Sequence, residues 1–133
     1  MKEQKNLNSN QLLKLFCCVM IKNGETKFNR DRLMKTMYDY KSIEGFDCLL
    51  HDLTYSSYDS GLYCRQLDKS ILVFKLCGLL YHRGIETNDT INISNLLNED
   101  NLNGKYLKYT PMMEEIVSSY LEKDKTLYKA SNY

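Results

Sequence analysis

Apolar residues recur at helical spacing in the first part of the chain. Asn8, Ser9 and Asn10 are each able to cap a helix, and an Asn23-Gly24 pair follows about four turns later. Between them lie the apolar residues Leu12, Leu13, Leu15, Phe16, Val19 and Met20. This i, i+3, i+4, i+7 spacing predicts a helix that turns one wide side to the core and ends at the Asn-Gly pair.

Two more helices are predicted before residue 54. Asn29 can cap a helix from Arg30 to about Tyr40. Its expected buried face is Leu33, Met34, Met37 and Tyr38. The segment "SIEGFDCLLHDL" repeats the spacing with Ile43, Phe46, Leu49, Leu50 and Leu53. "ETKF" is expected to be extended, and "TYSSYDSG" is expected to be a loop.

Residues 65 to 94 predict a helix followed by a small β-hairpin. The helix would run from about Arg65 to Cys77, with Gly78 in the left-handed position behind it. Leu67, Ile71, Phe74 and Cys77 form its expected inner face. "LLY" and the alternating "TINIS" would be strands joined by "RGIETND". The alternative, a helix through Gly78 to Arg83, is disfavoured because an internal glycine costs about 1 kcal/mol relative to alanine.

The last helix is predicted to begin at Thr110, with Pro111 in its first turn. Its apolar face is Met112, Met113, Ile116, Val117, Tyr120 and Leu121. We therefore expect one domain over residues 1–133, with an ordered core at 6–123 and a polar C-terminal tail at 124–133.

Charge is unevenly distributed along the 133 residues, although the formal net charge is only +1. Residues 1–41 hold nine Lys or Arg against four Asp or Glu (9 − 4 = +5), and residues 42–133 hold nine against thirteen (9 − 13 = −4). A local basic surface serves a phosphate contact or an acidic protein partner equally well. The five cysteines are odd in number and lie among apolar residues, which predicts reduced thiols and a cytoplasmic, intracellular protein. The run "LLKLFCCVMI" is too short to span a membrane, so no membrane association is expected.

Cysteine and histidine side chains are the candidates for metal binding. Cys48, His51, Cys77 and His82 are four zinc-type ligands, but the interval between His51 and Cys77 is far from the compact spacing of a zinc finger. Buried thiols and two surface or capping histidines are the favoured interpretation. No nucleotide-binding or hydrolase motif is present, so we expect no metal, no cofactor and no enzymatic activity.

Two sets of side chains are candidates for binding a partner. Helix residues Arg65, Gln66, Lys69 and Ser70, with Arg83 on the predicted hairpin, would contact DNA through base edges and phosphates. The simpler alternative is that they form the solvated side of a core helix. Tyr55, Tyr58 and Tyr63 cluster before this helix and would serve as anchors for a protein partner.

A family resemblance adds to this picture. The spacing L-x3-I-x2-F-x3-G-L-L, from Leu67 to Leu80, resembles the third helix and first wing strand of a winged helix-turn-helix domain. "QLLKLFCCVM" and "SGLYCRQLDKSILVFKLCGLL" are similar to the Panacea-type domain of prophage and toxin–antitoxin settings, over roughly residues 11 to 81. This similarity implies a small regulatory or antitoxin-like binding protein and no catalytic residue.

The expected fold is therefore mainly α, with about five helices and a small β-hairpin in a winged-helix-like single domain. The expected function is a non-enzymatic regulator that binds DNA. The alternative is an inhibitor or antitoxin, encoded by a phage or other mobile element, that binds a host or toxin protein. A homodimer is compatible with the sequence.

Overall fold

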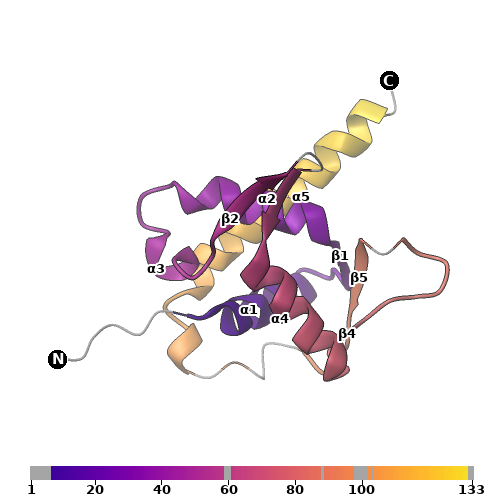
Figure 1. Cartoon of the computed structure of the whole chain (residues 1–133), viewed down its shortest axis with the longest axis horizontal. Helices are drawn as coiled ribbons and strands as arrows, with labels where there is room; N and C mark the ends of the chain where they lie inside the picture. The colour runs from indigo at the N-terminus through magenta and orange to yellow at the C-terminus, as the bar shows by residue number, and fades with distance from the viewer. Residues whose placement is uncertain (1–6, 59–60, 88, 98–101, 103, 132–133) are drawn as a thin grey trace.

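The structure is a computed structural model that describes residues 7–58, 61–87, 89–97, 102 and 104–131. The side chains of residues 58, 61, 105 and 123–131 lie outside this description. The chain is mainly α, as expected, and five α-helices lie in the described part. The elements in chain order are α1 (Ser9–Lys22), β1 (Lys27–Asn29), α2 (Arg30–Lys41), α3 (Asp47–Leu50), β2 (Tyr55–Tyr58), β3 (Gly61–Cys64), α4 (Arg65–Leu76), β4 (Leu80–Tyr81), β5 (Thr90–Ile93), the 3₁₀ turn η2 (Gly104–Tyr106) and α5 (Thr110–Ser131) (Figure 1).

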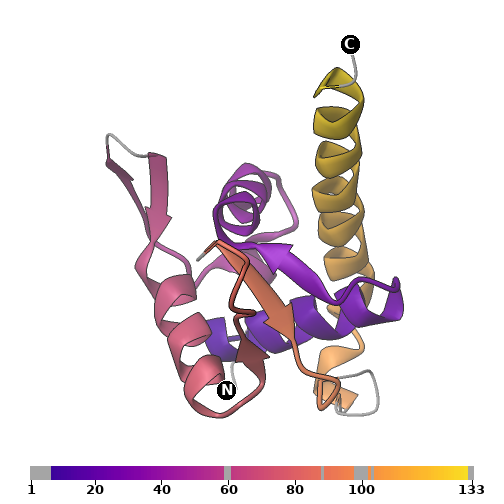
Figure 2. The same cartoon turned by 90° about the vertical axis from the view of Figure 1, so that its right-hand side faces the viewer.

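Helix α1 is the centre of the fold. Asn8 caps it in a reciprocal capping box: the Asn8 side chain accepts from the Gln11 N–H at 2.9 Å, and the Gln11 side chain accepts from the Asn8 N–H at 3.0 Å. From residue 12 to residue 20 only Lys14 is not buried. Helices α4 and α5 both pack on α1 and lie on opposite sides of it (Figure 2). A helix that is apolar on nearly all sides belongs inside a core, so α1 buries more than the single face that its spacing predicted.

The predicted second helix is confirmed, and the third is much shorter than predicted. Asn29 caps α2, its side chain accepting from the Arg32 N–H at 2.9 Å. Tyr38 is 43% exposed rather than buried, because it lies at the edge of the apolar face. Only Asp47–Leu50 of the third segment is helical. Gly45 has a φ of +98°, which interrupts the right-handed helix before Phe46, and Ile43 is left 44% exposed.

Helix α4 ends where the sequence predicts. Gly78 has a φ of +79°; its N–H donates to the Lys75 carbonyl at 3.1 Å, and the Leu79 N–H donates to the Phe74 carbonyl at 2.9 Å. These two bonds are a Schellman motif, which satisfies the last carbonyls of the helix and turns the chain. The alternative of an unbroken helix to Arg83 is wrong. Cys77 is exposed, not on the inner face, because it is the C-cap residue beyond the last helical turn.

The predicted hairpin is present and has a third strand. β4 pairs antiparallel with β5, and β5 also pairs antiparallel with β1, so the sheet order is β1-β5-β4. Leu80 lies opposite Ile93, and Phe28 lies opposite Ile91. All four side chains are buried against the helices. The loop between β4 and β5, described at residues 82–87 and 89, extends from this sheet and is called the wing below.

A second hairpin, β2–β3, occupies most of the segment for which a loop was expected. Tyr55 lies opposite Cys64 and Ser56 opposite Tyr63 in an antiparallel pair. The hairpin projects from the body beside the first turn of α4 (Figure 2). It was missed because its serines indicate a turn, whereas its tyrosines favour strands.

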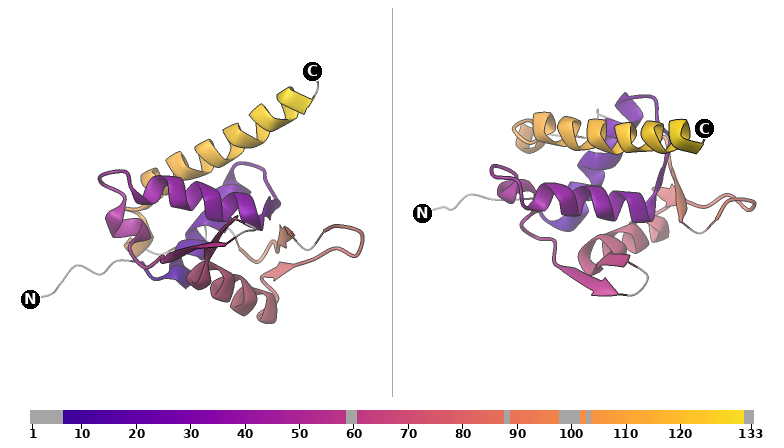
Figure 3. Two further views of the ribbon diagram at one scale, coloured as in Figure 1. Left: turned by 45° about the horizontal axis from the view of Figure 1, so that its top comes forward. Right: turned by 90° about the horizontal axis from the view of Figure 1, so that it is seen from above.

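Helix α5 begins at Thr110, as predicted, and its backbone runs to Ser131. Its C-terminal end extends beyond the other elements, on the side of the molecule opposite α4 (Figure 3). Thr110 is the first helical residue rather than the residue before the helix, and its hydroxyl donates to the Tyr106 carbonyl at 3.0 Å. Within the described residues, no helix combines the length and apolar character that a membrane crossing requires.

Candidate functional site

The outer face of α4 carries a continuous row of exposed side chains. Arg65, Lys69, Leu72 and Leu76 follow one another at intervals of four, three and four residues. At about 100° per residue they lie within roughly 60° of one another on the helix surface. All four are exposed, Leu72 to 54% and Leu76 to 79%, and Val73 lies on the edge of the row at 37%. We call the four residues the α4 stripe.

The stripe is cationic at its N-terminal end and apolar at its C-terminal end. Within the described residues, neither Arg65 nor Lys69 has an ion-pair partner. Asp68, the acidic residue of the same turn, points elsewhere: it accepts from the Tyr63 hydroxyl at 3.0 Å and lies 3.7 Å from Arg30. Arg65 also lies in the first turn, where the helix dipole disfavours a cation. The first turns of α4 therefore present uncompensated positive charge.

Ser70 does not belong to this surface. It is 2% exposed, and its hydroxyl contacts the Ser9 hydroxyl at 3.0 Å and the Asn10 side chain at 2.6 Å. The sequence placed Ser70 on the reading face because it is polar, but it lies between Leu67 and Phe74 on the inner side. Its predicted role in DNA contact is wrong for this conformation.

The side chain of Gln66 already makes hydrogen bonds within the protein. Its side-chain oxygen accepts from the Thr54 N–H at 3.0 Å and from the Cys64 thiol at 3.5 Å. These bonds hold the segment before β2 against the start of α4. Gln66 therefore helps to position the hairpin, and its carbonyl oxygen is not available to a base edge.

Arg83 is exposed at the start of the wing, and polar contacts hold this loop in place. The His82 ring nitrogen Nδ1 lies 3.0 Å from the Thr90 carbonyl oxygen. Glu86 pairs with Lys27 at 3.0 Å and accepts from the Asn92 amide at 2.7 Å. These hydrogen bonds, that from Asn92 foremost, lower the pKa of Glu86. The loop also presents Ile85 fully exposed.

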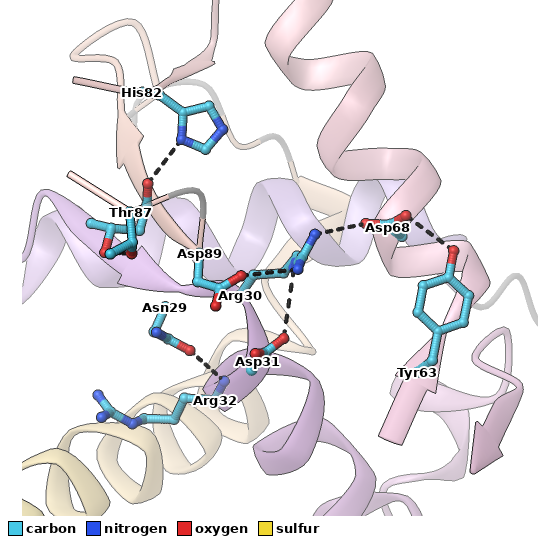
Figure 4. A network of polar contacts seen from close by, with 10 residues as sticks. Asn29, Arg30, Asp31, Arg32, Tyr63, Asp68, His82, Thr87 and Asp89 are labelled. Carbon is cyan, nitrogen blue, oxygen red and sulfur yellow. Dashed lines mark hydrogen bonds and ion pairs between the residues drawn. The ribbon is translucent and has the colours of Figure 1, made fainter. Parts of the chain in front are cut away.

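One arginine connects the wing, the hairpin and α4. Arg30 lies 2.9 Å from Asp89 and 3.7 Å from both Asp31 and Asp68 (Figure 4). Tyr63 joins the same network through Asp68. A single guanidinium, on the first residue of α2, thus contacts carboxylates of the wing and of α4, and Asp68 extends the network to the hairpin.

The tyrosines of the β2–β3 hairpin are used mainly to anchor it. The Tyr55 hydroxyl donates to the Met34 carbonyl at 2.6 Å, and its ring packs edge-on against Tyr38 at 5.1 Å. Burial raises the pKa of the Tyr55 phenol well above its ordinary value. Tyr63 is held by Asp68, and the Tyr58 side chain lies outside the described residues. Two of the three predicted anchors therefore have hydroxyls that bond inside the protein.

In the part of the chain that is described, the candidate metal ligands do not form a metal site. No three His, Cys, Asp or Glu side chains there lie close enough to share a metal ion, so Cys48, His51, Cys77 and His82 are not brought together. Burial raises the pKa of the thiols of Cys17 and Cys64. An open hollow of about 470 Å³ between β1, the wing and α5 is lined by neither cysteine nor histidine.

Leu72, Val73 and Leu76 were not among the predicted site residues, although the sequence carries a signal for them. Counting only the inner row of apolar residues identifies Leu67, Ile71 and Phe74 as core. Plotting the remaining apolar residues at 100° intervals puts Leu72 and Leu76 on the same side as Arg65 and Lys69.

Compared with protein-family models, curated proteins and solved structures, the chain has no significant match. Its function must therefore be argued from its own surface.

Proposed function

We propose that this chain is a non-enzymatic regulator that binds another protein through the α4 stripe. The observation that carries the proposal is the exposure of Leu72 and Leu76, at 54% and 79%, in one row with Arg65 and Lys69. Single exposed apolar residues are ordinary, but a row at intervals of three and four is the pattern by which a helix docks on a partner. An antitoxin or an inhibitor of a host protein, in a cytoplasmic setting, is the kind of regulator that fits.

The test compares two matched pairs of substitutions. A tagged chain, purified from the cells that naturally produce it, is expected to retain one protein in a fixed ratio. Leu72→Asp with Leu76→Asp is expected to lose that protein. Leu96→Asp with Leu107→Asp is the control, because these leucines are 62% and 70% exposed and lie outside the stripe. Equal retention by both pairs, or equal loss, would contradict the proposal.

DNA binding is the second candidate, and the order of elements favours it. The order α1, β1, α2, α4, β4, β5, with α3 and the β2–β3 hairpin inserted between α2 and α4, and the sheet order β1-β5-β4 support a winged-helix interpretation in which α4 is the recognition helix. Arg65, Lys69 and the wing residue Arg83 are exposed and would meet phosphates or guanines. Against this, Ser70 is buried, and the second half of the stripe has no polar group to offer a base.

The two candidates respond differently to substitution. If DNA is the target, Arg65→Glu with Lys69→Glu abolishes retention of DNA at low salt without lowering the melting temperature, and Leu76→Asp has little effect. The absorbance ratio at 260 and 280 nm of the freshly purified protein gives the first answer, because co-purified nucleic acid raises it.

A further inference from the structure

We propose that the segment bound by the α4 stripe is an acidic amphipathic helix, whose carboxylates face Arg65 and Lys69 and whose aliphatic side chains pack on Leu72 and Leu76. This inference rests on the proposed function, because it names the chemistry of the protein partner at the same surface.

The order of charged and apolar residues along the stripe determines the order of groups that its ligand must present. Arg65 and Lys69 are separated by about 6 Å along the axis, and so are Leu72 and Leu76, at 1.5 Å per residue. The cations are not matched by a carboxylate within the described residues, since Asp68 is engaged by Tyr63 and Arg30. A ligand that complements both halves has two acidic groups at one end and two apolar groups at the other.

The spacing favours a helix as the bound element. Intervals of four, three and four residues keep the four side chains in one row, and two helices bury such rows against each other along their length. An extended strand repeats every two residues, so its side chains would fall out of phase with the stripe. The matching pattern in the partner is Glu-x3-Glu-x2-Leu-x3-Leu, with aspartate equivalent to glutamate.

A second copy of the chain fits this surface poorly. If two α4 helices pack antiparallel, Arg65 and Lys69 of one copy lie against Leu76 and Leu72 of the other, and four cations are covered without a carboxylate. If they pack parallel, the cations face each other. Charge complementarity therefore favours an acidic partner over self-association.

The experiment uses synthetic peptides of about 18 residues, which are long enough to present the whole row. One peptide carries Glu-x3-Glu-x2-Leu-x3-Leu, and a second carries the same row in reverse order to allow either orientation. The matched control replaces both glutamates by lysine. Each is held helical by one side-chain lactam on the opposite face. Binding to the isotopically labelled full chain is followed by chemical-shift titration.

We expect a glutamate peptide to bind with a dissociation constant of about 10–100 µM, since a single helix covers less than a standard interface. Shifts should be confined to α4 and its neighbours, and the lysine peptide should bind about tenfold more weakly. Arg65→Glu with Lys69→Glu should reverse the preference, because both charges then change sign, and Leu76→Asp should weaken both peptides. Melting temperatures of the variants establish that they remain folded.

Several results would overturn the inference. These are equal binding of the glutamate and lysine peptides, no binding of any peptide at about 1 mM, displacement of a bound peptide by duplex DNA, and self-association of the free chain that Leu76→Asp abolishes. If peptides show no charge preference while the natural partner is still lost with Leu72→Asp and Leu76→Asp, only this inference fails. If that pair leaves the partner bound, the proposed function fails with it.

Discussion

Arg30 and Asp89 are joined twice. The guanidinium of Arg30 lies 2.9 Å from the Asp89 carboxylate, and the backbone N–H of Arg30 donates to the Asp89 carbonyl at 2.8 Å. The end of the wing is thereby attached to the first residue of α2. Because the same guanidinium reaches Asp68, the orientation of the wing is coupled to that of α4.

Removal of the Arg30 side chain is expected to loosen the wing without unfolding the protein. Arg30→Ala leaves the backbone bond intact and costs about 1 kcal/mol of unfolding free energy, as for a partly exposed ion-pair network. Urea denaturation measures the cost, and hydrogen exchange should accelerate within residues 82–90. Arg30→Lys is the control, since one ammonium cannot span three carboxylates and should restore only part of the protection. Unchanged exchange in Arg30→Ala would show that the backbone contacts alone fix the wing.

Substitution of Gly78, the glycine that ends α4, is expected to lower the stability of the protein. A Cβ at this position would meet no atom within 4 Å, so the cost of Gly78→Ala comes from the backbone at φ +79° and not from a clash. A left-handed non-glycine residue costs about 1–2 kcal/mol. Gly104→Ala is the control, because it also meets nothing within 4 Å and lacks the positive φ. Equal melting temperatures for the two variants would contradict this account of the helix end.

The Tyr55 hydroxyl is expected to hold the β2–β3 hairpin on α2. Tyr55→Phe keeps the ring contact with Tyr38 but leaves the Met34 carbonyl without its 2.6 Å donor, at a cost of about 1 kcal/mol. Tyr38→Phe is the matched control, since that ring is 43% exposed. Chemical denaturation compares the two variants, and a larger loss for Tyr38→Phe would be the contrary result.

Glu86 predicts a contribution to stability that disappears in acid. Hydrogen bonds from Asn92 and Lys27 lower the pKa of Glu86 in the folded protein. A lowered carboxyl pKa adds stability that is complete above the unfolded value of about 4.3 and is lost as the pH falls through the folded value. Glu86→Gln should therefore melt below the wild type at pH 7, and the difference should vanish in strong acid. A difference that persists unchanged below the folded pKa would show that it does not come from the charge.

The sequence predicted the elements whose ends carry local signals. Asn8 and Asn29 mark helix starts by their side-chain bonds, and Gly78 marks a helix end by its left-handed backbone. Between residues 42 and 64 such signals conflict. Gly45 interrupts an otherwise helical pattern. The tyrosine-serine segment forms a hairpin with the residues after it, and the hydroxyls of Tyr55 and Tyr63 donate to Met34 and Asp68, which the local sequence does not identify as partners.

The candidate site was predicted in part for a similar reason. The exposure of Arg65 and Lys69 follows from the inner row of α4. The burial of Ser70 does not, because it depends on Ser9 and Asn10 meeting α4 from a distant part of the chain. Leu76 was not predicted to be exposed. Whether an apolar side chain is buried depends on which other elements pack against it, and the local sequence does not show that no element covers Leu76.

The central position of α1 determines how the domain unfolds. With α4 on one side of it and α5 on the other, neither helix can detach without wetting the apolar surface between Leu12 and Met20. Detaching one helix therefore costs much of the free energy of complete unfolding, and the elements around α1 should unfold as one cooperative unit. A protease would find its early cleavage sites in the projecting hairpin, while α1 stays intact until the whole domain gives way.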